Sequence, residues 1–186
     1  MKGGKAMWKS LHAMLVGVAI SIGSVSPGYG VEAFMYVDGI PGEEIEQKHL
    51  EWIRVLSFNS DVYHLVSAAG AGTGRVTMSP ISIVKFVDKA TPSLALAVFD
   101  GRNIKRVVLE MLNAPGQPPY LRIELEDVFV SSVKLEIPEE ITVPRPLERV
   151  SFNFGTINWI YSQLDPSGKP IGSFKAGWDL RMNVKQ

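Results

Sequence analysis

The chain has 186 residues, of which 46% are hydrophobic and 20% are charged, an ordinary composition for one globular domain. It contains no cysteine, which excludes disulfides, thiolate zinc sites, iron–sulfur clusters and cysteine nucleophiles. Nineteen basic residues balance nineteen acidic ones, and the residues after 30 carry a small acidic excess, so nucleic acid is not an expected partner.

The first thirty residues differ in composition from the rest. Lys2, Lys5 and Lys9 precede a short apolar run at 11–22, and small residues with a proline follow. This order is typical of a secretory signal peptide, and the run is shorter than the ~20 residues of a membrane span. Three alternatives stay open: a cleaved signal, an uncleaved anchor, and a start codon assigned too far upstream. We therefore expect residues 1–30 to be an extension and residues 31–186 to be the folded domain, without stable membrane insertion.

The first part of the domain predicts strands separated by flexible loops. Residues 31–37 alternate as a strand does, and the turn "VDGIPGE" follows at 37–43. A second strand is predicted from about 52 to 63. The stretch 66–74 is rich in glycine but lacks the glycine-lysine-serine/threonine ending of a phosphate-binding loop, so it predicts a mobile loop between strands.

One helix is predicted, at about 91–100. Thr91 is the expected N-cap, Pro92 suits the first helical position, and Gly101 suits the position after the helix. Its residues are mostly apolar, so we expect it to pack against a sheet. Pro80 should lie at a sheet edge or at a break, because proline cannot donate to a strand ladder.

Strands dominate again after the helix. They are predicted at 104–112, 120–137 and 149–161, with a β-bulge at Gly155–Thr156 and a short final strand after the turn at 165–172. The fold class is therefore mainly β: a small β-barrel of two packed antiparallel sheets with one flanking α-helix (about 91–100).

Candidate chemistry is sparse. His49 and His64 lie too far apart in sequence for a typical metal-site spacing, and no glycine-x-serine-x-glycine elbow is present. Paired carboxylates such as Glu124 and Glu126, or Glu126 and Asp127, are more simply the solvated side of a strand. Three tryptophans are candidates for a sugar site or, more simply, for packing: Trp52, Trp159 and Trp178. We expect no enzyme, no catalytic residue, no metal and no cofactor.

A series of short blocks resembles a known family. In order they are "YVDGIPGE" (36–43), "WIRVLSFN" (52–59), "GRVTMS" (74–79), "VDKATPSL" (87–94), "IELEDVFVSS" (123–132), "RVSFNFGTI" (149–157) and "KAGWDL" (175–180). Together they span about residues 31–182 and resemble the haemolysin-coregulated protein (Hcp) family, the inner-tube subunit of bacterial type VI secretion systems.

The resemblance implies a homohexameric ring, stacking of rings into a hollow tube, and ejection by a contractile sheath with effectors in the lumen. It implies assembly in the bacterial cytoplasm, and partners that include the sheath, the tip spike and small effector proteins. The resemblance also implies an assembly loop, with candidates Tyr63, His64, Leu65, Val66, Gly70, Gly72 and Gly74. A C-terminal motif is expected in core or subunit contacts: Gly177, Trp178, Asp179 and Leu180.

Two features depart from the family pattern. A signal-like segment would direct the subunit to the periplasm, away from the cytoplasmic assembly site. The chain also stops soon after the C-terminal motif, so an enzymatic effector is not expected. The alternative function is a secreted monomeric β-barrel module that binds carbohydrate or protein and has lost ring assembly.

Overall fold

The computed structural model describes residues 31–64, 76–136 and 145–186. Strands are the main element of this part of the chain, as the alternating sequence patterns predict. The bounds are β1 Glu32–Val37, η1 Gln47–His49, β2 Ile53–Val55, β3 Ser57–Asn59, β4 Val62–His64, β5 Val76–Met78, β6 Ile81–Phe86, α1 Thr91–Asp100, β7 Ile104–Leu112, β8 Leu121–Glu136, β9 Leu147–Asn153, β10 Thr156–Leu164, β11 Pro170–Asp179 and β12 Val184–Lys185.

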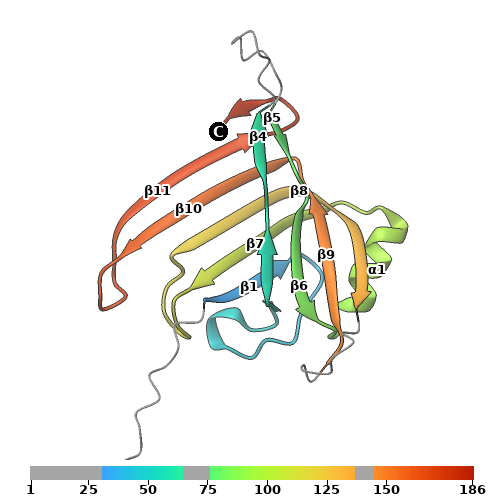
Figure 1. The fold of residues 1–186 in the computed structure, drawn as a ribbon, viewed down its shortest axis with the longest axis horizontal. Coiled ribbons are helices and arrows are strands. Elements are labelled where there is room, and N and C mark those ends of the chain that lie inside the picture. Colours follow the sequence, from blue (N-terminus) through green and yellow to red (C-terminus); the bar gives the residue numbers. More distant parts are fainter. Residues whose placement is uncertain (1–30, 65–75, 137–144) are drawn as a thin grey trace, which may run out of the picture.

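Ten of the described strands form two antiparallel sheets that share β8, and β4 and β5 form a separate two-stranded sheet (Figure 1). The larger sheet has the order β12-β11-β10-β8-β7-β1-β2, and the second has the order β3-β6-β9-β8. The first part of β8 pairs with β7 and β10, and its last part pairs with β9. On the opposite side, the Leu56 N–H donates to the Val84 carbonyl oxygen (2.8 Å), which connects the β2–β3 segment to β6. The arrangement is barrel-like.

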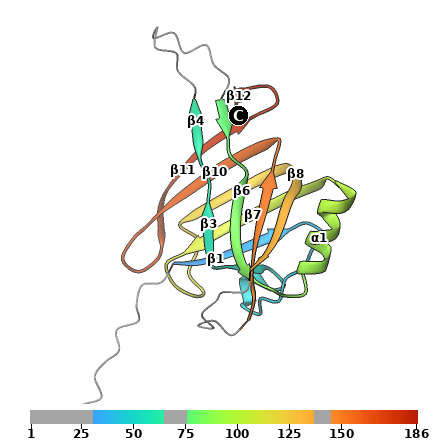
Figure 2. The same cartoon turned by 45° about the vertical axis from the view of Figure 1, so that its right-hand side comes forward.

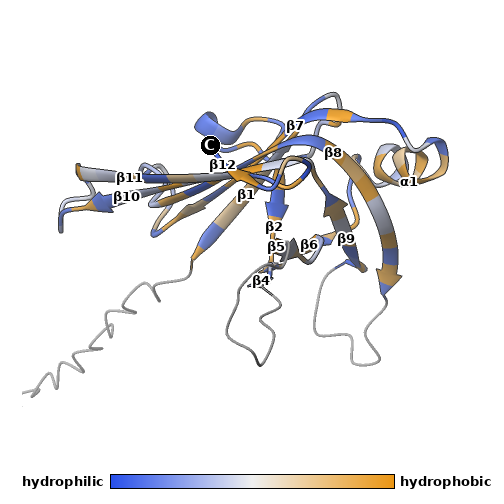
Figure 3. Cartoon of the chain, turned by 90° about the horizontal axis from the view of Figure 1, so that it is seen from above, coloured by the Kyte–Doolittle hydropathy of each residue, from blue (hydrophilic) through white to orange (hydrophobic). Residues whose placement is uncertain are grey.

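A change of backbone direction lets β8 belong to both sheets. Asp127 has φ 51°, and the register with β9 shifts between Val130 and Ser132. In Figure 3, β8 curves away from the plane of β10 and β11 toward β9, and α1 lies on the outer side of that curve. Figure 2 shows the same helix beside β8, against which it packs.

The core lies between the two sheets and under the helix. Alternate residues of each strand point into it, as in β7, where Val107 and Leu109 are buried in the apolar cluster. Ile123 and Leu125 of β8 and Phe152 of β9 fill the same space. The predicted fold class, mainly β with two sheets and one flanking helix, is confirmed.

The turn after β1 requires its glycines for two different reasons. Gly39 has φ 75°, a conformation that residues with a Cβ rarely adopt. Gly42 lies against the backbone of the following segment, because a Cβ there would stand 2.3 Å from the Trp52 carbonyl oxygen. The Gly42 N–H donates to the Glu51 carbonyl oxygen (2.6 Å), which holds this close approach in place.

The helix spans the predicted residues but begins differently. Thr91 is its first helical residue and not its N-cap; Ala90 stands at that position without a side-chain cap. The Thr91 hydroxyl accepts a hydrogen bond from the Asp88 N–H, and Asp88 Oδ1 accepts one from the Ala90 N–H. These two bonds fix the loop before the helix in place of a side-chain cap. Gly101, with φ 62°, ends the helix as predicted.

Three strand predictions need correction. The single strand predicted at 52–63 is three short strands, because the chain leaves β1 at Leu56 to pair with β6. The predicted bulge at Gly155–Thr156 is a corner between β9 and β10, which pair with different parts of β8 and belong to different sheets. The turn predicted at 165–172 is shorter, since β11 begins at Pro170 and forms a long hairpin with β10.

Candidate assembly surfaces

The first predicted assembly residues lie on a projecting hairpin. Tyr63 and His64 belong to β4, which pairs with β5 and extends away from the two larger sheets (Figure 1). The Val62 and Tyr63 side chains are 55% and 48% exposed. The remaining loop candidates lie outside the described residues: Leu65, Val66, Gly70, Gly72 and Gly74.

The C-terminal motif occupies the end of β11. Trp178 pairs with Ile157 of β10 and packs, partly buried, against the core, and the Leu180 N–H donates to the Gly155 carbonyl oxygen (2.9 Å). Gly177 lies beneath the Asn158 amide, where a Cβ would stand 2.1 Å from Asn158 Oδ1. The motif therefore fixes the last long strand on the sheet; its part in subunit contacts stays a prediction.

Asp179 holds the chain reversal that follows β11. Its buried carboxylate accepts hydrogen bonds from the backbone N–H groups of Arg181 (2.8 Å) and Met182 (2.9 Å). The bond from Met182 is the largest of several contacts that lower the pKa of Asp179 below its ordinary value. The sequence motif includes Asp179 but did not predict that its side chain stabilises the turn after β11.

The fold brings the two predicted groups toward one another. The Val76 N–H, at the start of β5, donates to the Asn183 side-chain oxygen (3.2 Å) in the turn after the C-terminal motif. Asn183 has φ 58°, a conformation that asparagine tolerates better than most residues. The far end of the paired strands β4 and β5, where His64 pairs with Val76, and the C-terminal turn are thus neighbours at one end of the molecule (Figure 1).

The β10–β11 hairpin forms a second surface, which the sequence analysis missed. Its outer part, residues 161–176, is named the flange. Tyr161, Ile171 and Phe174 of the flange are 47%, 60% and 62% exposed, and the Tyr161 and Phe174 ring centroids are 6.3 Å apart. Within the described residues, β11 pairs with β12 only at Trp178 and Asp179, so the flange also presents an unpaired strand edge.

A third exposed apolar surface lies on the helix. Leu96 and Phe99 of α1 are 52% and 86% exposed, while Leu94 and Ala97 face the core. The helix was predicted to pack against a sheet, and its inner side does so. Its outer side adds an apolar patch remote from the flange.

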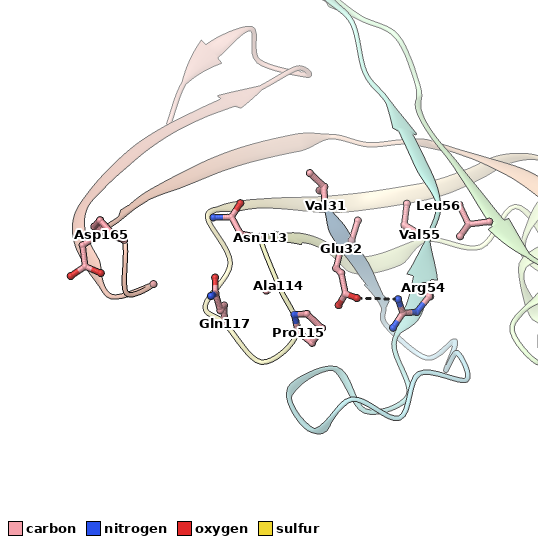
Figure 4. Close-up of a pocket in the computed structure, with 13 residues that line it drawn as sticks. Val31, Glu32, Arg54, Val55, Leu56, Asn113, Ala114, Pro115, Gln117 and Asp165 are labelled. Carbon is pink, nitrogen blue, oxygen red and sulfur yellow. Dashed lines mark ion pairs between the residues drawn. The ribbon is translucent and has the colours of Figure 1, made fainter. Parts of the chain in front are cut away.

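A broad groove separates the flange tip from β1 and β2 (Figure 4). Its volume is about 870 Å³, and its lining includes Val31, Leu56, Pro115 and Pro166. Glu32 and Arg54 form an ion pair (3.6 Å) across its wall. The lining combines apolar side chains with this ion pair and with the polar residues Asn113, Gln117 and Asp165.

His49 and Glu124, which were considered for chemistry, have structural partners. His49 is buried, with Nδ1 2.6 Å from Glu46 and Nε2 2.8 Å from Glu110. Glu124 accepts from Arg106 (2.8 Å) and Arg122 (2.6 Å), while Glu126 is exposed farther along β8. No group of three or more potential metal ligands occurs within residues 31–64, 76–136 and 145–186.

These observations define a class of protein. Two antiparallel sheets carry projecting hairpins with exposed aromatic side chains, and His49, Glu124 and Asp127 are engaged in ion pairs. Such a protein acts through its surfaces. In the described part of the chain, no helix has the length and apolar character needed to cross a membrane.

Comparison with known proteins identifies the family. Residues 34–161 match the family described as "Type VI secretion system effector, Hcp". Protein hcp1 of Pseudomonas aeruginosa is 32% identical over 161 residues, an alignment covering 83% of this chain and 98% of that protein. The Major exported protein of the same organism is 25% identical over 147 residues, covering 74% and 85% of the two chains. The chain belongs to the Hcp family of the type VI secretion system.

Solved structures give the same result. A type six secretion system protein superposes with a TM-score of 0.77 at 28% identity, covering 84% of this chain and 100% of that one. Hcp1 from Salmonella typhimurium superposes with a TM-score of 0.70 at 28% identity, covering 84% and 99%. The family consists of secreted tube proteins and not enzymes, which confirms the predicted family and the non-enzymatic function.

Proposed function

We propose that this chain is the subunit of a type VI inner tube. Six copies close into a ring through a heterologous interface, and rings stack into a hollow tube that a sheath ejects together with a tip spike and small effectors in the lumen. The observation that carries the proposal is the flange: an exposed aromatic pair on a hairpin with an unpaired edge, in a chain of the Hcp family. A head-to-tail contact of this kind closes into a ring when its rotation permits.

The flange supports a subunit contact on physical grounds. A long strand edge with exposed aromatic side chains favours pairing with another chain. Burial of such side chains supplies about 25 cal/mol per Å² of apolar area. β12 covers the edge of β11 at Trp178 and Asp179. A strand from a neighbouring subunit can therefore pair with β11 only along the flange.

Substitution of two matched phenylalanines tests the ring. Phe174→Asp places a charge in the flange, whereas Phe99→Asp places the same charge on the exposed side of α1. We expect Phe174→Asp to abolish rings in negative-stain microscopy and Phe99→Asp to retain them, with both proteins folded by circular dichroism. If Phe174→Asp still formed rings, the flange would not be the subunit contact. If the wild-type protein were a monodisperse monomer, the alternative function as a binding module would be supported.

Stacking is assigned to the hairpin that carries Tyr63 and His64. Deletion of 66–74 should leave rings intact and prevent their association into tubes, because it removes most of the sequence that connects β4 to β5. Tubes of unchanged length would contradict this assignment.

The place of assembly has its own test. We propose assembly in the cytoplasm and release by the type VI system, with residues 1–30 absent from the working subunit. N-terminal sequencing of protein recovered from culture medium should begin close to Val31. A secreted protein that retains residues 1–30 would contradict this.

A further inference from the structure

The outward face of the larger sheet contains a cup whose lining includes no residue of the flange or of the β4–β5 hairpin. Six side chains line it, and its volume is about 360 Å³: Tyr36, Asp38, Trp52, Arg106, Val108 and Arg122. Strand register places these residues together, because Tyr36 pairs with Val108 and Val108 pairs with Glu124. Directly paired residues of antiparallel strands point to the same face of the sheet.

Two aromatic rings form one wall of the cup. The Tyr36 and Trp52 centroids are 5.7 Å apart, with their planes inclined at 50°. The buried His49 ring contacts Trp52 edge-on at 4.9 Å and stacks on Phe34 at 4.3 Å, so the wall is supported from behind. Trp159 and Trp178, in contrast, pack against the core. Trp159 also lines a recess, beside Glu124 and Lys175, but the recess of Trp52 holds a second aromatic ring, that of Tyr36.

Polar groups line the rest of the cup with fixed positions. The Tyr36 hydroxyl donates to Asp38 Oδ1 (3.2 Å), and burial together with this carboxylate raises the pKa of Tyr36. Arg106 donates to Glu124 (2.8 Å), and Arg122 donates to both Glu124 and Glu110. These bonds use only part of the five N–H donors of each guanidinium and of the acceptor capacity of Asp38.

The charge of the cup selects against strongly charged ligands. Both guanidinium groups are already paired with Glu110 and Glu124, so an anion finds no uncompensated cation. A cation could pair with Asp38 but would lie beside the Arg106 and Arg122 guanidinium groups, so a single carboxylate is all that favours it. A neutral ligand with several hydroxyl groups can instead use the donors and acceptors while its apolar face lies against the aromatic wall.

We propose that the cup formed by Tyr36, Asp38, Trp52 and Arg106 binds a neutral saccharide. The aromatic wall contacts the C–H face of one sugar ring, and Asp38 and Arg106 bond its hydroxyl groups. The cup is shallow, so the expected dissociation constant is millimolar, about the weakest affinity that a specific site shows. The inference does not depend on ring formation, because all the lining residues belong to one chain.

Saturation-transfer NMR with the full chain and cellotriose tests the proposal. Tyr36→Phe and Asp38→Asn should each weaken binding roughly tenfold, because each removes hydrogen bonds that involve a charged group. The matched controls are Tyr161→Phe in the flange and Asp100→Asn at the end of α1, which should bind as the wild type does. Circular dichroism confirms that all four variants are folded.

Three outcomes overturn the proposal. The first is the absence of saturation transfer at about 10 mM cellotriose in both the wild type and the Phe174→Asp variant. This variant is included because, without a ring, no neighbouring subunit can cover the cup. The second is an equal loss of binding in the Tyr161→Phe control. The third is tighter binding of glucuronate than of glucose, which would show that the cup selects an anion. Tube assembly is measured separately, so its failure and the failure of saccharide binding are distinguishable.

Discussion

At the scale of single residues, a buried ion pair connects the second sheet to the helix. Lys85 of β6 and Glu148 of β9 are both 0% exposed, and the Lys85 ammonium also donates to Asp88 (2.7 Å) and to the Phe86 carbonyl oxygen (2.9 Å). The Thr91 hydroxyl donates to the same Glu148 oxygen (2.9 Å). One charged cluster therefore fixes the loop that begins the helix.

Removal of one partner of this pair should be costly. Lys85→Met leaves the Glu148 carboxylate buried without its cation, and we expect the free energy of unfolding to fall by about 3–5 kcal/mol in a urea titration. The double variant Lys85→Met with Glu148→Leu should recover most of that loss. A single substitution that costs less than about 1 kcal/mol would show that the pair does not behave as a buried one.

The close approach at Gly42 gives a second residue-level prediction. Gly42→Ala forces the Trp52 backbone to move, and we expect a loss of roughly 2–3 kcal/mol in the free energy of unfolding. Gly172→Ala in β11 is the matched control, because its nearest neighbour would stand at 3.4 Å, an ordinary contact. Equal stabilities for the two variants would contradict the packing described for the turn after β1.

Acid should destabilise the folded chain through its paired carboxylates. Burial opposes ionisation of Glu124, but hydrogen bonds from Arg122 and Arg106 outweigh it and lower the pKa of Glu124. The hydrogen bond from His49 lowers the pKa of Glu46. Because these pKa values are lower in the folded chain than in the unfolded chain, the unfolded chain binds more protons in acid. The free energy of unfolding that these groups contribute is therefore complete above the ordinary glutamate pKa of 4.5 and is lost as the pH falls below it.

The measurement is the melting temperature as a function of pH. We expect it to decrease as the pH falls from about 5, and to decrease less steeply in Glu124→Gln, which removes one of the groups that titrates. A melting temperature that rises on acidification would contradict the assigned pKa directions.

At the scale of elements, the sequence was informative where local chemistry decides the structure. β7 and α1 occupy the predicted residues, since alternation defines the strand and Gly101 ends the helix. The prediction from sequence was wrong at 149–161, where the apolar residues indicated one bulged strand. The break there depends on distant partners: the Gly155 N–H donates to the carbonyl oxygens of Glu126 and Asp127.

The turn after β11 is held by one side chain, so its loss should be local. Asp179→Ala removes the acceptor of two backbone N–H groups, and we expect faster hydrogen exchange in residues 180–185 with a stability loss of about 1–2 kcal/mol. The control is Asp165→Ala at the flange tip, which likewise removes the acceptor of two backbone N–H groups. It should leave hydrogen exchange in residues 180–185 unchanged. Exchange that accelerates equally in β1 and β7 would show that the effect is global.

At the scale of the whole molecule, composition and pattern predicted the fold class, and the resemblance predicted the family. The candidate surfaces were predicted less completely. Tyr63 and Asp179 lie in sequence motifs, but the flange depends on how far β11 extends beyond the strand that follows it. The burial of His49 depends on Glu110, which is distant in sequence and becomes its neighbour only through the pairing of β1 with β7.

The proposed tube function requires that the chain form a ring of identical subunits. Sedimentation velocity of the purified, folded protein over a range of concentrations measures this most directly. We predict one dominant species with the mass of six chains, replaced by the single chain in Phe174→Asp. A wild-type protein that keeps its native circular dichroism and sediments as one chain at every concentration would contradict the account.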